Sequence, residues 1–111
     1  MPITNTRLTT TAVSTVYTSA GNNAVTTMIV CNTGAVNLTD ETVNAAALTV
    51  YFVPNGQTAT DSTTVVKNLT VPAGETVFFS DEKVILGNGD TIQAQANAGN
   101  LLTVTVSTLA V

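Results

Sequence analysis

The sequence contains no histidine, no tryptophan and a single cysteine in 111 residues. Without histidine the chain lacks the usual general base at neutral pH, and one cysteine can form neither a tetrahedral zinc site nor an internal disulfide. Charged residues make up only 9% of the chain, against about 25% in an ordinary soluble domain. With a net charge of -4 and three basic residues, the chain cannot neutralise a phosphate backbone, so we expect no nucleic-acid partner.

Long apolar runs are also missing. No run reaches the roughly 18 residues that a membrane-spanning helix needs, and the opening MPITNTRLTT lacks the basic and apolar regions of a secretory signal. We therefore expect no membrane association and a chain that stays in the cytoplasm where it is made. Cys31, in the apolar run MIVC, is expected to be a small buried hydrophobe, and Lys67 and Lys83 are expected to face solvent.

Threonine is what the chain has in abundance, with 23 copies. Threonine is β-branched and suits a pleated, half-exposed surface better than a helix. Runs rich in Val, Thr, Ile and Tyr alternate between apolar and polar residues, and Gly, Pro and Asn separate them. The candidate strands are residues 11–19, 24–32, 47–53, 63–71, 76–80, 83–86, 91–97 and 101–111.

Three short segments predict turns. Pro54-Asn55-Gly56 ends one candidate strand, and Gly87-Asn88-Gly89-Asp90 contains two glycines with an aspartate that can hydrogen-bond the local backbone. Pro72-Ala73-Gly74-Glu75 separates two β runs by only four residues, which predicts a tight antiparallel connection between them.

These patterns predict an all-β protein: an antiparallel β-sandwich, Ig-like or jelly-roll, of seven to eight strands. The length fits one domain, which we place at residues 11–111, preceded by an N-terminal arm at residues 1–10 that is too polar to seek a core. The apolar ending of the chain predicts that its C-terminus is tied into a sheet or an interface. The predicted core residues are Ile29, Val50, Phe52, Val71, Phe78, Ile92, Val104 and Val106.

No combination of residues predicts catalysis. Six of the seven carboxylates lie in expected loops or strand ends, where solvated turn residues explain them, and Cys31 has no histidine to serve as its base. Asp81, Glu82, Asn88 and Asp90 are close enough in sequence to suggest calcium, yet their spacing does not match an EF-hand loop. We expect no enzyme activity, no catalytic, cofactor-binding or metal-binding residues, and no cofactor.

The second half of the chain resembles the small β-sandwich structural proteins of tailed bacteriophage virions, which decorate capsids or build neck and tail parts. The resemblance is carried by LTVYFVPNG, by VVKNLTVPAGETVFFSDEKVILGNGDTIQAQAN and by LLTVTVSTLAV, so it covers residues 47–111. These are turn and strand motifs, which specify a fold better than a position in the virion. The family implies no catalytic residues.

The resemblance implies a non-enzymatic structural protein of a phage virion, assembled in the host cytoplasm. The expected role is a capsid decoration or cement protein bound in many copies, whose partners are a major capsid protein or neck and tail proteins, together with further copies of the chain. The low charge supports this, because the cores of protein interfaces are depleted of charge. The alternative is a neck, tail or fibre component, including a receptor- or carbohydrate-binding module, although the chain has no tryptophan to stack on a sugar.

Overall fold

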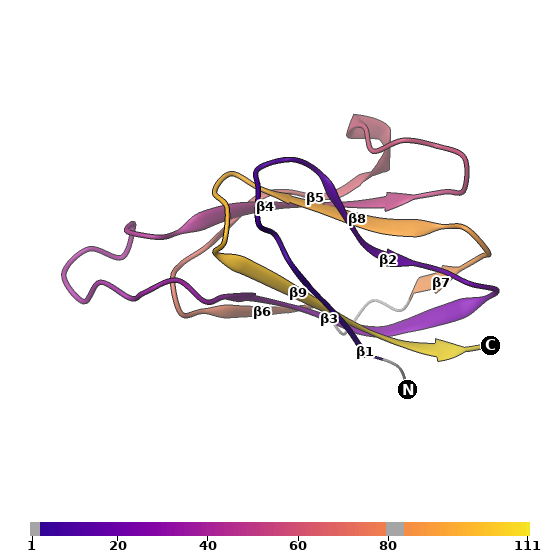
Figure 1. Ribbon diagram of the computed structural model, residues 1–111, viewed down its shortest axis with the longest axis horizontal. Helices are drawn as coiled ribbons and strands as arrows, with labels where there is room; N and C mark the ends of the chain where they lie inside the picture. The colour runs from indigo at the N-terminus through magenta and orange to yellow at the C-terminus, as the bar shows by residue number, and fades with distance from the viewer. Residues whose placement is uncertain (1–2, 80–83) are drawn as a thin grey trace.

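The structure, a computed structural model, describes residues 3–79 and 84–111. In these residues the chain forms strands and one short 3-10 helix, drawn in Figure 1. The first half contains β1 (Ile3–Arg7), β2 (Ser14–Thr18), β3 (Asn23–Asn32) and β4 (Ala46–Val53). The second half contains η1 (Asp61–Thr63), β5 (Thr64–Val71), β6 (Thr76–Phe79), β7 (Val84–Leu86), β8 (Thr91–Ala96) and β9 (Leu102–Ala110).

The strands form two antiparallel sheets that pack face to face, as Figure 1 shows. One sheet has the order β1-β9-β3-β6, with β7 also paired to β3, and the other has the order β2-β8-β4-β5. We call them the five-stranded and the four-stranded sheet. The predicted β-sandwich is therefore confirmed, with β1 as a strand that the sequence pattern did not indicate.

The pairing is nested around the β4–β5 connection. β4 pairs with β5, β3 with β6 and β7, β2 with β8, and β1 with β9, and these pairs lie alternately in the four-stranded and the five-stranded sheet. The lateral pairs β3–β9 and β4–β8 then complete each sheet. With β6 and β7 counted as one interrupted strand, this is the jelly-roll arrangement, so of the two predicted sandwich types the structure is a jelly roll.

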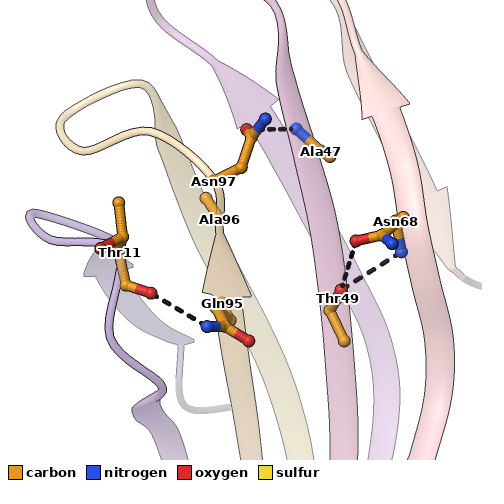
Figure 2. Close-up of a pocket in the computed structure, with 7 residues that line it drawn as sticks. All are labelled: Thr11, Ala47, Thr49, Asn68, Gln95, Ala96 and Asn97. Carbon is orange, nitrogen blue, oxygen red and sulfur yellow. Dashed lines mark hydrogen bonds between the residues drawn. The ribbon is translucent and has the colours of Figure 1, made fainter.

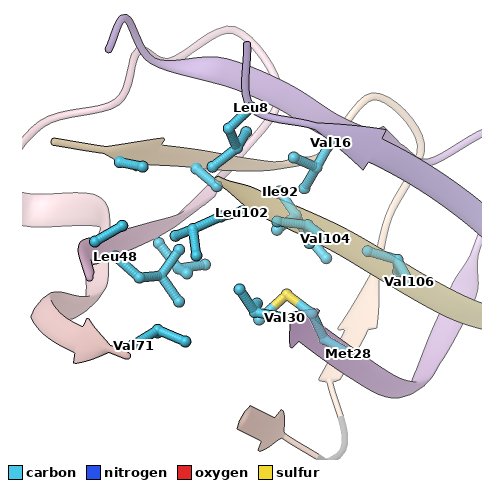
Figure 3. Packing of buried hydrophobic residues seen from close by; sticks show 14 of the residues in the cluster. Leu8, Val16, Met28, Val30, Leu48, Val71, Ile92, Leu102, Val104 and Val106 are labelled. Carbon is cyan, nitrogen blue, oxygen red and sulfur yellow. The ribbon is translucent and has the colours of Figure 1, made fainter. Parts of the chain in front are cut away.

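The core lies between the sheets and consists of aliphatic side chains from both, as Figure 3 shows. Leu48 and Ile92 of the four-stranded sheet meet Val30, Leu102 and Val104 of the five-stranded sheet, and all five are fully buried. Phe52 is half-buried and packs against this cluster. The predicted core residues that the structure confirms as buried are Val50, Val71, Ile92, Val104 and Val106.

Two core predictions, Ile29 and Phe78, are wrong. The register of β3 against β9 shifts between Val25 and Thr27, so Val25 is buried before the irregularity and Met28 and Val30 are buried after it. Ile29 therefore points outward, beside Phe78, which is 64% exposed. A bulge of this kind exchanges the two faces of a strand, and alternation read along the chain cannot detect it.

All three predicted turns form, each closed by a hydrogen bond from its fourth residue to the carbonyl of its first: Gln57 to Pro54, Glu75 to Pro72 and Asp90 to Gly87. The third residue is in each case a glycine at positive φ. The expected antiparallel pairing across residues 72–75 is wrong, because β5 and β6 lie in different sheets. A jelly roll passes most of its connections from one sheet to the other.

Both ends of the described chain belong to the five-stranded sheet. β1 pairs with β9, and β9 continues to Ala110, so the C-terminal strand is part of the sheet as expected. The proposed division into an arm, residues 1–10, and a sandwich, residues 11–111, stays a prediction, because pairing inside one chain does not test whether the segment separates in an assembly.

Candidate functional site

The carboxylates of the described residues belong to loops, turns and η1, and most of them are exposed. Asp40, Glu41, Asp61 and Glu75 are exposed, and Asp61 forms an exposed ion pair with Lys67 at 3.9 Å. No group of three Cys, Asp or Glu residues that could hold a metal ion occurs in residues 3–79 and 84–111. These side chains have the solvated positions that the sequence predicts for them.

Asp90 joins two turns at one end of the sandwich. Its Oδ2 accepts a hydrogen bond from the backbone N–H of Gly87 at 2.8 Å, and its Oδ1 accepts one from the N–H of Asn55 at 2.9 Å. Because both carboxylate oxygens are occupied by backbone donors, Asp90 acts as the turn residue that the sequence predicts.

Two of the four residues considered for calcium, Asn88 and Asp90, use their side-chain oxygens in loop hydrogen bonds. Asn88 uses its Oδ1 to accept the N–H of Gly21 at 2.9 Å, and Asp90 is held in the turn described above. Asp81 and Glu82 lie outside the described residues. Asn88 and Asp90 thus fasten loops together with the oxygen atoms that a calcium site would require.

Asp40 belongs to the long connection between β3 and β4, which projects from one end of the sandwich in Figure 1. Its Oδ1 accepts hydrogen bonds from the hydroxyl of Thr42 at 2.6 Å and from the backbone N–H of Thr42 at 3.0 Å. These bonds stabilise the charged carboxylate and hold the pKa of Asp40 below its ordinary value, the hydroxyl contributing most. The carboxylate of Asp40 thus helps to order this loop.

Cys31 lies on the outward side of β3, between the fully buried Val30 and Asn32, and is itself half-buried. The prediction that it is a buried core residue is wrong, for the same reason as that of Ile29: the outward residues of β3 after the bulge are Ile29 and Cys31. Lys67 faces solvent as predicted, whereas Lys83 lies outside the described residues.

A polar hollow of about 250 Å³ lies on the outer face of the four-stranded sheet, as Figure 2 shows. Its lining residues are Thr11, Ala47, Thr49, Asn68, Gln95, Ala96 and Asn97. The polar groups already have partners in the chain: Gln95 Nε2 donates to the carbonyl of Thr11, Asn97 Oδ1 accepts from the N–H of Ala47, and Thr49 Oγ1 accepts from the N–H of Asn68. The hollow is polar enough for a small polar ligand. Several of its hydrogen-bonding groups, however, are already engaged within the chain.

The outer face of the five-stranded sheet has the opposite character. Ile3, Phe78, Ile85 and Leu109 are large exposed hydrophobic residues on its strands, and Ile29 lies among them. This surface was not predicted from the sequence, because Ile29 and Phe78 were expected to lie in the core. The signal was present in β6, whose TVFF places one aromatic residue on each face, and only the packing decides which is buried.

No helix of the described residues is long and apolar enough to cross a membrane. No family model matches the sequence, and no curated protein matches it. Among solved structures, the chain is similar to a chain in the acidic stable capsid structure of Helicobacter pylori bacteriophage KHP30, with a TM-score of 0.53 and 12% sequence identity over 96% of this chain and 87% of that chain. At that identity the likeness concerns the fold.

Proposed function

We propose that this protein is a non-enzymatic structural component of a phage virion, bound in many copies to the capsid as a decoration or cement protein. The observation that carries the proposal is the extent of the structural likeness, which covers 96% of this chain and 87% of a chain from a phage capsid structure. A chain of comparable length and similar fold thus occurs in a phage capsid structure. The resemblance of residues 47–111 to small phage virion proteins supports the same role independently of that structure.

The surface chemistry supports a structural role as well. The described carboxylates belong to loops, turns and η1, and those of Asp40 and Asp90 accept loop hydrogen bonds. A capsid component that binds its neighbours permanently benefits from neutral surfaces, because contacts between uncharged groups avoid the cost of burying charge. The expected partners are the major capsid protein and further copies of this chain.

The experiment that tests the proposal is a density map of intact particles of the phage that encodes the chain, together with mass spectrometry of the purified particles. The expected result is this jelly roll bound at many equivalent positions on the outside of the shell. Density for the chain only at the neck, tail or fibre would replace the decoration role with the alternative, and absence of the chain from the particles would overturn the virion role.

The alternative is a neck, tail or fibre component that binds a receptor or carbohydrate. The polar hollow around Thr49, Asn68 and Gln95 is the observation that favours it. The described residues that line the hollow include no aromatic side chain, and stacking on an aromatic face is a common means of holding a sugar. Binding of a glycan array by the purified chain, lost in a Gln95→Ala variant, would support the alternative over decoration.

A further inference from the structure

Two turns at the same end of the sandwich contain the same dipeptide, Asn-Gly. Asn55-Gly56 lies between β4 and η1, and Asn88-Gly89 lies between β7 and β8. Each turn is closed by the same type of backbone hydrogen bond, and the two glycines have φ values of 83° and 85°. A hydrogen bond from the N–H of Asn55 to Oδ1 of Asp90 joins the turns. The two dipeptides therefore differ mainly in what surrounds them.

An asparagine followed by a glycine can lose its side-chain amide in water without a catalyst. The backbone nitrogen of the glycine gives up its proton to hydroxide and forms a bond to Cγ of the asparagine, and the bond from Cγ to Nδ2 breaks. Nδ2 takes up a proton from water and leaves as ammonia, so that a succinimide ring remains. Water then opens the ring at either carbonyl and gives aspartate or isoaspartate. In sum, one water is consumed and one ammonia is released, with no change in oxidation state.

The fold engages both reacting groups of Asn88-Gly89 in other contacts. The N–H of Gly89 donates to the carbonyl of Ser19 at 2.8 Å, and Oδ1 of Asn88 accepts from the N–H of Gly21 at 2.9 Å. The first bond keeps the proton on the attacking nitrogen, and the second holds the amide that must rotate toward it. Because both bonds must open before the ring can close, this dipeptide should react slowly in the folded chain.

The corresponding groups of Asn55-Gly56 have no such bonds. In the described part of the chain, neither the N–H of Gly56 nor the side chain of Asn55 forms a hydrogen bond. Both residues are exposed, and no heavy atom lies within 4 Å of the position that a Cβ on Gly56 would occupy. The bonds that hold this turn join Gln57 to Pro54 and the N–H of Asn55 to Asp90, so they leave the reacting groups free.

We propose that Asn55 is a deamidation site of the folded protein, where water converts it to aspartate and isoaspartate, whereas Asn88 is protected by its hydrogen bonds. The side chain of Asn55 lies against Gly89, since a Cβ added to Gly89 would be 2.6 Å from Cγ of Asn55. Conversion therefore places a carboxylate beside Gly89 and adds one negative charge to the net charge of -4. The reaction needs only the chain and water, so it does not depend on the virion role.

The test is a peptide map of the purified protein after incubation in mildly alkaline buffer. Trypsin cleaves after Arg7, Lys67 and Lys83, so the two asparagines fall in different peptides, and fragmentation assigns each gain of one mass unit. Asn55 is expected to deamidate at least about tenfold faster than Asn88, because two hydrogen bonds protect the latter. In the chain denatured by urea the two rates are expected to agree within about threefold, because both asparagines precede a glycine without a Cβ to obstruct the attack.

Two variants separate the reaction at Asn55 from other changes. Gly56→Ala is expected to slow deamidation of Asn55 at least about fivefold, because the added Cβ obstructs the attack, and to leave the rate at Asn88 unchanged. Asn55→Gln lengthens the side chain and disfavours the ring. Ion-exchange chromatography should show a more acidic species that accumulates in the wild type and not in Asn55→Gln. Circular dichroism confirms that both variants are folded.

Hydrogen exchange provides a second measurement that needs no variant. The N–H of Gly56 is expected to exchange with deuterium at least about 100-fold faster than the N–H of Gly89, since only the latter is hydrogen-bonded. Equal exchange of the two groups would contradict the protection on which the proposal depends.

Equal deamidation rates at Asn55 and Asn88 in the folded protein would overturn the proposal. It would also be overturned if Asn55 stayed intact in the folded chain while both asparagines reacted in urea, because the turn itself would then be protective. A difference that persists unchanged in urea would assign the selectivity to the flanking sequence and exclude the fold as its cause. Failure of the virion role appears separately, as absence of the chain from particles.

Discussion

Asn32 shows how one side chain can hold two connections against the sandwich. It is fully buried at the end of β3, and its Nδ2 donates to the carbonyls of Asn44 and Val71 at 2.8 and 2.9 Å. Its Oδ1 accepts from the N–H of Gly34 at 2.8 Å. The side-chain amide of Asn32 thus provides hydrogen-bond partners for three backbone groups near the core.

Asn32→Ala is expected to destabilise the protein by about 2 to 4 kcal/mol, because it leaves the two carbonyls and the N–H of Gly34 without partners. Urea denaturation measures the change. The matched control is Asn97→Ala, since Asn97 is exposed and accepts a single hydrogen bond from Ala47; its cost should be about 1 kcal/mol. Equal costs for the two variants would show that burial of Asn32 is unimportant.

Asp40 provides a test by titration. The folded-state pKa is lowered, chiefly by the hydroxyl of Thr42, so the stabilisation is fully present above the ordinary value of 3.8 and is lost as the pH falls through the folded pKa. NMR titration should give Asp40 a midpoint below 3.8 in the wild type. Thr42→Ala should raise the pKa of Asp40 most of the way back to its ordinary value, because the hydroxyl donor is lost. A midpoint that Thr42→Ala leaves unchanged would assign the shift to another group.

At the scale of elements, glycines act through two different physical effects. Gly56 adopts a φ of 83°, which side chains rarely adopt, but open space surrounds the position of an added Cβ. Gly99 is in an ordinary region of φ, yet an added Cβ would lie 2.5 Å from the carbonyl oxygen of Thr9. The connection before β9 therefore packs directly on the segment that follows β1.

Gly99→Ala is expected to destabilise the fold more than Gly56→Ala. The Gly56 variant should lose about 1 kcal/mol from backbone strain alone. The Gly99 variant should lose at least about 2 kcal/mol, because two backbone segments must separate and the hydrogen bond from the N–H of Asn100 to the carbonyl of Leu8 is strained. Thermal unfolding of the two variants under identical conditions makes the comparison, and the reverse order would contradict the packing described here.

The glycines of the predicted turns allowed most strand ends to be predicted from the sequence. Gly56, Gly74 and Gly89 are at positive φ in the turns that the sequence indicates, and the flanking strands begin and end within a few residues of the expected positions. Residues 3–7 were not expected to form a strand, because ITNTR has a single apolar residue. Its pairing with β9 depends on the backbone of a strand that lies about 100 residues away in the sequence.

For the whole molecule, the position of Leu8 decides how the N-terminal segment can be removed. Leu8 is fully buried, and its N–H donates to the carbonyl of Leu102 at 2.9 Å. Deletion of residues 1–7 removes β1 and leaves Leu8. Deletion of residues 1–10, the predicted arm, also removes a core side chain.

Deletion of residues 1–10 is therefore expected to cost at least about 3 kcal/mol more than deletion of residues 1–7, the usual loss for a buried leucine. Urea denaturation of both truncated chains measures the difference. The shorter deletion is the suitable variant for asking whether the arm is required for incorporation into particles. Normal incorporation of a folded chain without residues 1–7 would contradict an assembly role for β1.

The absence of histidine has a consequence for the whole molecule. No side chain type with an ordinary pKa between about 5 and 8 is present, so folding should release or take up few protons in this range. The free energy of unfolding, measured in urea at pH 5.5, 6.5 and 7.5, is expected to vary by less than about 0.5 kcal/mol. Larger variation would require a strongly shifted carboxyl, with the residues outside the described ranges, Asp81 and Glu82, as the ones to mutate first.

The sequence by itself determined the fold class, the turns and the positions of most strands, because these depend on local properties: the period-two alternation, the stiffness of threonine and valine, and the freedom of glycine at positive φ. It also determined that histidine, the usual general base at neutral pH, takes part in no site of this chain, because the sequence contains none.

Only the tertiary structure decided which sheet each strand joins and which side of a strand is buried. β5 and β6 are separated by one turn, yet nested pairing of distant strands places them in different sheets. In β6, Val77 and Phe79 face the core while Phe78 faces outward, although both faces of TVFF carry an apolar residue. The bulge in β3 reverses the faces of Ile29 and Cys31 in the same way. Contacts between the sheets select one of two nearly equal local alternatives, and that selection leaves Ile29 and Phe78 on the outer face of the five-stranded sheet.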